Sequence, residues 1–388
     1  MKTAARRVTL ALLSLIASAL GAEILVRLVF GSRFAPRPAF TVVDEELIKR
    51  LSPDLDHTFH GADFQIHIAT DALGNRLGSL GPIDDTDSDL VLLVGDSNIF
   101  SWGVSTPDTL ASHLDTLLHS ATGVRAVNLG VGGYGTLQAA ARLQRFLGKI
   151  DPARVRAILV LHITNDCTDN EIFLLYQNGY MEFTEKAASS IQGNRSPLHT
   201  VNLARQIAFS KPAAGSQPGT SARNATGDAG FVDVLQTTGM WYSSKKPAPI
   251  TLPTGFVVDA DHEIFDRKLH KGRLKRLYES DVPPSALQSE LLQLAIEQIG
   301  RAAEGLEIPI IHTAQSPNAR FSSAVEDAVT RTPPRGNRVL FRSLPADEPP
   351  RNPHSGGHYT PEHNRFLAEL FLGWLQDQGV AVTASSGR

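Results

Sequence analysis

The sequence is poor in cysteine, in net charge and in histidines spaced as metal ligands, and each of these features argues against a class of protein or site. Cys167 is the only cysteine among 388 residues, so neither a disulfide within the chain nor a zinc site made of cysteines can form. The formal net charge is −3, and no cluster of Lys and Arg with interleaved aromatic residues occurs, so no nucleic-acid partner is expected. The histidines His57, His60 and His67 match no spacing typical of metal ligands. We therefore expect neither a metal nor a cofactor.

The one long apolar run lies at the extreme N-terminus. Arg6 and Arg7 precede apolar residues 8–22, and the apolar character continues to Phe30. Basic residues before an apolar run are typical of a secretory signal, and the whole stretch is nearly long enough to span a bilayer. An uncleaved signal anchor, or transmembrane helix, is favoured over a cleaved signal for residues 1–30. The rest of the chain is then expected outside the cytoplasm, although arginines beyond the run argue against that orientation.

The central stretch of the chain is a buried strand that ends in a serine. Residues 90–94 are all apolar, which is typical of a strand buried in a parallel sheet. Gly95, Asp96 and Ser97 break this run, and a helical pattern follows Pro107. Ligands of open α/β sheets bind at the carboxyl ends of the strands, where Ser97 is expected. The alternative is that Asp96 and Ser97 only cap a helix.

Two further strands are predicted to end at the same edge of the sheet. Residues 124–129 lead into a glycine-rich turn that contains Gly133, and residues 155–163 lead into Asn165. Polar or glycine residues at three converging strand ends indicate an active site. The turn also resembles those of nucleotide-binding folds. However, its spacing is not G-x-G-x-x-G, so dinucleotide binding is disfavoured.

The rest of the chain is divided by composition. Residues 31–86 are predicted to be a linker and a small β extension, and residues 87–378 the main domain. An irregular insertion at about 176–284 is expected to form a lid or a substrate-binding wall. Residues 379–388 are expected to be a tail.

A serine nucleophile needs a base and hydrogen-bond donors for the oxyanion that forms on attack. The backbone N–H groups of Gly133 and Ser97 and the side-chain amide of Asn165 are the candidate donors. His358, just before the last predicted helix, is the candidate base. Asp96 and Asp166 are expected to fix the loop backbone, and His162 to pack or to support the site.

These residues resemble the four blocks of the SGNH (GDSL-type) hydrolases. The blocks are residues 95–98, 128–133, 164–166 and 358–361, and their order along the chain matches that family. The resemblance implies a three-layer α/β/α sandwich with a parallel flavodoxin-like sheet. It also implies Ser97 as nucleophile, Gly133 and Asn165 as oxyanion donors, and His358 as base. Membrane-anchored bacterial members often act on acyl groups of envelope lipids or O-acetyl groups of polysaccharides.

The last block departs from the family, which usually has an aspartate two or three residues before the histidine. Ser355 and Gly356 stand there, so a backbone carbonyl, Asp347 or Glu348 would have to orient the imidazole. His354 and His363 are the alternative bases. The expected function is a serine esterase that works through an acyl-serine, anchored on the periplasmic side of the inner membrane. The substrate is expected to be an acylated carbohydrate or a lipid. The alternatives are an O-acyltransferase on polysaccharide and a catalytically weak carbohydrate- or lipid-binding module.

Overall fold

The structure is a computed structural model, and it describes most of the chain. The described residues are 2–30, 39–60, 65–83, 88–183, 198–201, 203–204, 240–266, 283–315, 319–345, 347–349, 351–352 and 358–380. Much of the predicted insertion, the predicted linker at 31–38 and all but the start of the predicted tail lie outside these residues.

A five-stranded parallel sheet forms the centre of a mixed α/β fold. Its strands are β5 (Leu90–Val94), β6 (Arg125–Asn128), β7 (Val155–Ile163), β12 (Pro309–Gln315) and β13 (Arg338–Phe341), in the order β13-β12-β7-β5-β6. The order reverses between β5 and β7, because the chain goes from β5 to the edge strand β6 and then back to the other side of β5. In open α/β sheets, the crevice at such a reversal binds ligands. Ser97 and Asn165 follow these two strands.

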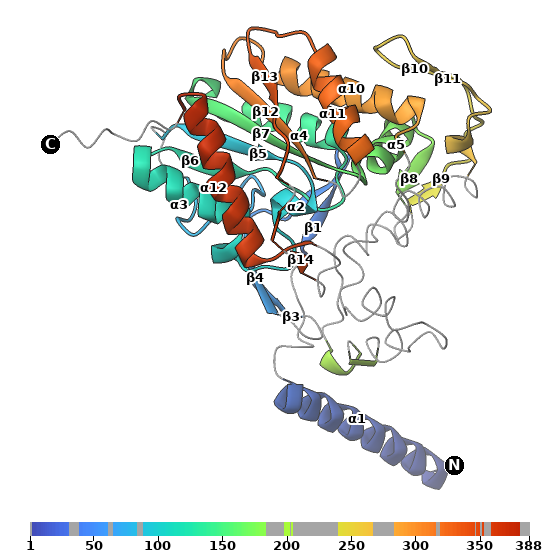
Figure 1. Cartoon of the computed structure of the whole chain (residues 1–388). Coiled ribbons are helices and arrows are strands. Elements are labelled where there is room, and N and C mark those ends of the chain that lie inside the picture. Colours follow the sequence, from blue (N-terminus) through green and yellow to red (C-terminus); the bar gives the residue numbers. More distant parts are fainter. Residues whose placement is uncertain are drawn as a thin grey trace, which may run out of the picture.

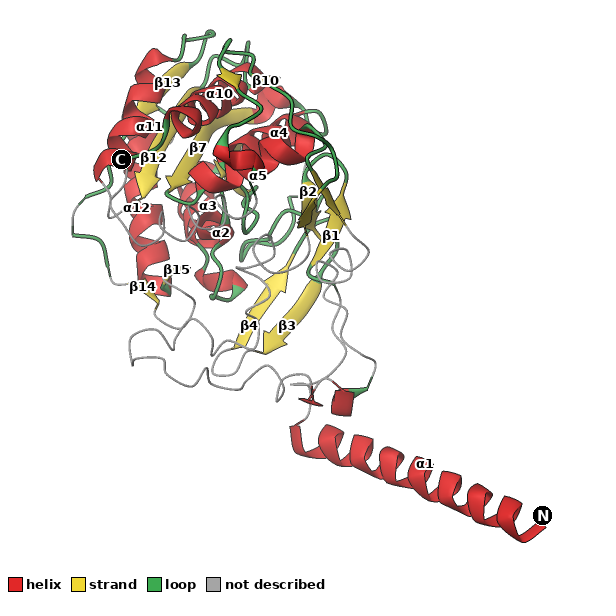
Figure 2. Cartoon of the chain, turned by 90° about the vertical axis from the view of Figure 1, so that its right-hand side faces the viewer, coloured by secondary structure: helices red, strands yellow, loops and turns green. Residues whose placement is uncertain are grey.

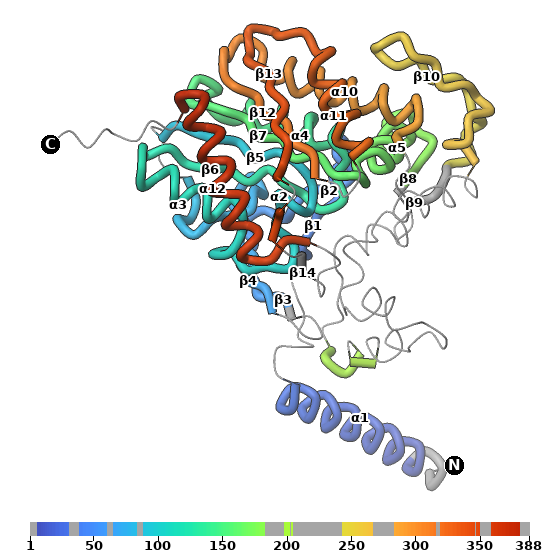
Figure 3. The backbone as a smooth tube through the Cα atoms, viewed as in Figure 1, coloured from blue at the N-terminus to red at the C-terminus, as the bar shows by residue number. Residues whose placement is uncertain are grey.

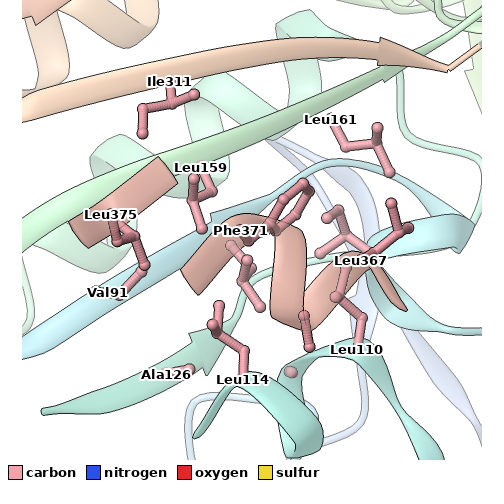
Figure 4. Packing of buried hydrophobic residues seen from close by; sticks show 14 of the residues in the cluster. Val91, Leu110, Leu114, Ala126, Leu159, Leu161, Ile311, Leu367, Phe371 and Leu375 are labelled. Atoms are coloured by element: carbon pink, nitrogen blue, oxygen red, sulfur yellow. The ribbon is translucent and has the colours of Figure 1, made fainter. Parts of the chain in front are cut away.

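Helices cover both faces of the sheet (Figure 1). One face carries α3 (Leu110–Thr122) and α12 (Pro361–Asp377), and the other carries α4 (Thr136–Leu147) and α10 (Ala286–Ala302). Figure 4 shows side chains of α3 and α12, among them Leu114 and Phe371, packed against Val91 of β5. Leu92 of β5 packs on the opposite face. A strand buried on both faces is apolar at every position, which explains the continuous run at residues 90–94.

Two antiparallel hairpins precede the sheet. They are β1 (Thr41–Asp44) with β2 (Ile48–Leu51) and β3 (Asp56–His60) with β4 (Gln65–Ala69), the latter hairpin being prominent in Figure 2. Their apolar side chains pack with Phe100 and Tyr134, which follow β5 and β6. The guanidinium of Arg76 donates to the backbone oxygens of Phe100 at 2.7 Å and of Ser101 at 2.8 Å. The segment before the sheet therefore holds the loops at the carboxyl ends of two strands.

The remaining elements are shorter or lie at the periphery. The helices are α2 (Ser97–Phe100), α5 (Asp166–Gln177) and α11 (Ala319–Arg331), with 3-10 turns η2 (Thr106–Asp108), η3 (Pro152–Arg154) and η5 (Glu263–Phe265). The strands pair as β8 (Met181–Phe183) with β9 (Met240–Tyr242), β10 (Ile250–Thr251) with β11 (Val257–Val258), and β14 (Arg351–Asn352) with β15 (His358–Tyr359).

The N-terminal helix α1 (Lys2–Phe30) stands apart from the sheet in Figure 1. A stretch of 18 residues within residues 6–30 has a mean hydropathy of 2.1, and only 6% of it is buried. No other described helix is long and apolar enough to cross a membrane. Twenty-five helical residues span about 37 Å, more than the roughly 30 Å of a bilayer's hydrocarbon core. This helix fits a membrane anchor or a signal sequence.

Candidate active site

Ser97 is the first residue of α2, and only Gly95 and Asp96 separate it from β5. A Cβ at Gly95 would lie 2.9 Å from the backbone oxygen of Leu161, so glycine alone fits where this chain turns beside β7. Asp96 caps α2, because its Oδ1 accepts from the backbone N–H of Asn98 at 2.8 Å. Helix α2 begins at Ser97 itself, earlier than the helical pattern after Pro107 indicates. The serine is partly exposed, although its neighbours on both sides are buried.

His358 meets Ser97 from the far end of the chain. Its Nε2 lies 2.8 Å from Ser97 Oγ. Figure 3 shows the segment before α12 beside α2, and β15, which carries His358, contacts α2. Pairing of His358 with Asn352 of β14, together with the Thr360 side chain that caps α12, fixes the backbone on both sides of the imidazole. The hydroxyl and the imidazole can therefore exchange a proton directly.

His354 and His363, the two alternative bases, do not take the place of His358 beside Ser97 among the described residues. His354 lies outside the described residues. His363 is fully buried on α12, its ring centroid 4.1 Å from that of Tyr359 and its Nε2 3.6 Å from Glu348 Oε2. Glu348, a candidate for orienting His358, thus lies against a different histidine.

Asp96 is the carboxylate beside the serine. Its Oδ2 accepts from Ser97 Oγ at 2.8 Å. Burial raises the pKa of Asp96 above its ordinary value, while the hydrogen bonds from Asn98 and Ser97 and the charge of His358 act in the opposite direction. Asp96 therefore fixes the loop, as the sequence suggests, and its charge also acts on His358.

Gly133 and Asn165 follow the strands on either side of β5, and both are partly exposed, as Ser97 is. Gly133 has a φ of +71°, a conformation that glycine adopts without strain. The Nδ2 of Asn165 donates to Asp169 Oδ2 at 2.9 Å. Since an amide nitrogen carries two hydrogens, the second one is left for a ligand.

Two charged residues that the sequence analysis did not single out lie in the same region. Lys49 of β2 is 2% exposed, and a Cβ at Gly133 would lie 3.2 Å from its Nζ. Burial lowers the pKa of Lys49 to about 8 and raises the pKa of Asp169 to about 7, and their opposite charges oppose both shifts. The charge of Asp96 also raises the pKa of Asp169. Asp169 lies four residues after Asn165, and this spacing on a helix could have predicted that their side chains meet. The sequence around Lys49 contains no comparable pattern that predicts its place in the site.

The remaining candidates at this edge are structural. His162 is fully buried, with Nε2 2.9 Å from His312 Nδ1, and burial lowers the pKa of His162 to about 3, so it is neutral. Asp166 Oδ2 accepts from the backbone N–H of Ile163 at 3.1 Å and so fixes the loop. Burial raises the pKa of the Cys167 thiol, which makes it unreactive. Within the described ranges, no three His, Cys, Asp or Glu side chains cluster as metal ligands would.

Comparison with known proteins gives only slight likenesses. No protein-family model and no curated protein matches the chain. Among solved structures, the acetyl xylan esterase Est2A of the rumen bacterium Butyrivibrio proteoclasticus aligns with a TM-score of 0.34 at 12% identity, over 77% of this chain and 66% of that enzyme. An epoxide hydrolase of Aspergillus niger aligns with a TM-score of 0.24 at 13% identity, over 83% of this chain and 78% of the hydrolase. Likenesses this slight assign no activity.

Proposed function

We propose that the chain is a serine esterase of the SGNH type, which hydrolyses carboxylic esters through an acyl-Ser97 intermediate. The observation that carries this proposal is the 2.8 Å separation between Ser97 Oγ and His358 Nε2 at the carboxyl edge of the sheet. A hydroxyl becomes a competent nucleophile when an adjacent base removes its proton, and this pair meets that requirement.

The reaction proceeds in two balanced halves. Ser97 Oγ attacks the ester carbonyl carbon as its proton passes to His358 Nε2. His358 then gives that proton to the leaving alkoxide as the carbon–oxygen bond breaks, which leaves an acyl-Ser97 ester. In the second half, His358 takes a proton from water, the resulting hydroxide attacks the acyl carbon, and Ser97 recovers its proton as the acid leaves.

Gly133 and Asn165 are assigned to the negative oxygen that forms on the attacked carbonyl. The backbone N–H of Gly133 and the second Nδ2 hydrogen of Asn165 would donate to it, together with the N–H of Ser97. Donors placed in advance stabilise the transition state without reorganising, and each is worth about 10²–10³ in kcat.

Asp96 is assigned the electrostatic part that the usual aspartate plays before the catalytic histidine. The charge of Asp96 acts on His358, whereas Glu348 lies against His363. A negative charge there stabilises the imidazolium that forms when Ser97 gives up its proton. The Ser97 hydroxyl carries one proton and has two neighbours, Asp96 Oδ2 and His358 Nε2, so the reactive arrangement is the one with the proton on the histidine side.

The SGNH assignment is also supported by the sheet. When the strands are numbered in chain order within the sheet, their order is 2-1-3-4-5, which is that of flavodoxin-like sheets. Blocks that follow the first three of these strands supply Ser97, Gly133 and Asn165, as in that family.

The apolar helix α1 supports a proposed location and substrate class. With α1 in a membrane, we propose that the body lies on the periplasmic side of the inner membrane, where acylated carbohydrates and envelope lipids are within reach. An O-acyltransferase would share the first half of the reaction and pass the acyl group to a sugar hydroxyl instead of water.

Hydrolysis of p-nitrophenyl acetate tests the proposal. Ser97→Ala should reduce turnover to the uncatalysed background, because the variant lacks the hydroxyl on which the proposed acyl ester forms. Ser120→Ala, an exposed serine on α3, is the matched control and should keep full activity. Unchanged turnover in folded Ser97→Ala protein would refute the assignment.

A further inference from the structure

We propose that Lys49 is a positioning residue for the oxyanion site: its buried ammonium group, through Asp169, orients the Asn165 carboxamide and keeps the surroundings of Gly133 positive. This inference rests on the esterase function proposed above. It assigns a task in the reaction to the β1–β2 hairpin, which lies outside the central sheet.

The position of Lys49 supports this role. Its side chain is 2% exposed, and Nζ would be only 3.2 Å from a Cβ at Gly133, so the ammonium lies directly against the glycine turn. Hydrogen bonds tie the hairpin to that turn and to the helix that follows. The Tyr134 hydroxyl donates to the backbone oxygen of Lys49, and the Gln138 side chain donates to that of Leu47 at 3.1 Å.

The backbone next to Lys49 is strained. Ile48 has a φ of +66°, which a β-branched residue adopts only when its surroundings force it. Its side chain is fully buried in a cluster with Leu137 and Phe173, and this packing holds the conformation. Strain of this kind is concentrated at functional sites, and here it accompanies the burial of the lysine that follows.

The electrostatics explain why a cation is needed there. The charge of buried Asp96 acts on buried Asp169. Asp96 accepts a hydrogen bond from Ser97 Oγ and Asp169 accepts one from Asn165 Nδ2, so each carboxylate contacts a residue assigned to the reaction. Without a nearby cation, these two negative carboxylates would destabilise the negative charge that develops on the oxyanion. The charge of Lys49 favours ionised Asp169, which accepts one hydrogen from Asn165 Nδ2 at 2.9 Å and leaves the other for the oxyanion.

The test is Lys49→Met, which keeps an unbranched side chain one atom shorter than that of lysine and removes its charge. With p-nitrophenyl acetate, kcat should fall about 10- to 100-fold while KM changes little, since the loss concerns the transition state. The matched control is Arg50→Met on the same strand, which removes a cation that pairs with Asp44 at 3.6 Å, and it should keep kcat. An unchanged kcat in Lys49→Met would overturn the proposal.

A double-mutant cycle with Asn165→Ala separates positioning from general support of the fold. If Lys49 acts through Asn165, adding Lys49→Met to Asn165→Ala should lower kcat by much less than it does in the wild type. If the two substitutions lowered kcat by independent factors that multiply in the double variant, Lys49 would not act through Asn165. If Lys49→Met does not fold in a thermal melt, Asp169→Asn must show the same dependence on Asn165 for the proposal to stand. The Ser97→Ala assay tests the esterase function independently of Lys49. A failure of the proposed function can therefore be distinguished from a failure of the role proposed for Lys49.

Discussion

His358 Nε2 lies 2.8 Å from Ser97 Oγ, across 261 positions of the chain. The contact joins the end of the first central strand to the segment that starts the last helix. Because α12 packs on the same face of the sheet as Val91 of β5, the contact depends on the docking of the last helix as well as on the chemistry.

Replacing this histidine should abolish most of the activity and leave the fold intact. His358→Ala is expected to lower kcat/KM for an activated ester by about 10²–10⁴-fold, the usual contribution of a general base. His119→Ala, an exposed histidine on α3, should be unaffected. Equal activity of the two variants would show that Ser97 has another base.

The glycine turn allows a controlled test of the oxyanion site. Gly133 and Gly123 have similar backbone angles, with φ of +71° and +76°, but a Cβ meets Lys49 at Gly133 and nothing within 4 Å at Gly123. Alanine at either position should cost about 1–2 kcal/mol of stability because of the left-handed conformation. Only Gly133→Ala should also lose activity, by roughly 10²-fold.

Parallel thermal melts and kinetic assays of the two alanine variants measure both effects. Loss of activity in Gly123→Ala, or full activity in Gly133→Ala, would contradict the place given to Gly133.

The raised pKa of Asp169 predicts how stability depends on pH. Its pKa is about 7 in the folded chain and 3.8 ordinarily, so between about pH 4 and 7 the folded state holds a proton that the unfolded state has released. Stability from this group is therefore present at low pH and is lost as pH rises towards 7. Asp169→Asn should remove that loss. Relative to the wild type, the free energy of unfolding of the variant should improve between pH 4.5 and 7.5, by up to a few kcal/mol.

Denaturant unfolding at a series of pH values measures this difference, with exposed Asp151→Asn as the control. Parallel pH dependence of wild type and Asp169→Asn would show that Asp169 is ionised normally.

The sequence predicted what depends on local pattern. The apolar runs of β5 and β7 mark strands covered on both faces, and Thr360 with Pro361 marks the start of α12. Ser97 and His358 could be selected because a nucleophile and a base stand at the ends of such elements.

The sequence could not predict what depends on docking between distant segments. In β2, Lys49 and Arg50 are adjacent cations, and only the packing of the hairpin on the glycine turn buries the first and leaves the second nearer the surface. In the same way, the sequence could not show that Glu348 would lie against His363, because the packing of a loop decides that.

Helix α1 predicts membrane attachment. The full chain should sediment with membranes, resist an alkaline wash and need detergent for release, since about 37 Å of apolar helix exceeds the hydrocarbon core. A variant that lacks residues 1–30 should stay in the supernatant. Full-length protein that is soluble without detergent, with its N-terminus intact, would contradict an anchor.

The most direct measurement of the central claim is mass spectrometry of the protein after exposure to a fluorophosphonate, which reacts with activated serines. We predict one adduct per chain, mapped to Ser97, that is formed much more slowly in His358→Ala. A wild-type chain that stays unlabelled, or that carries its adduct on another residue, would contradict the claim that His358 activates Ser97 as a nucleophile.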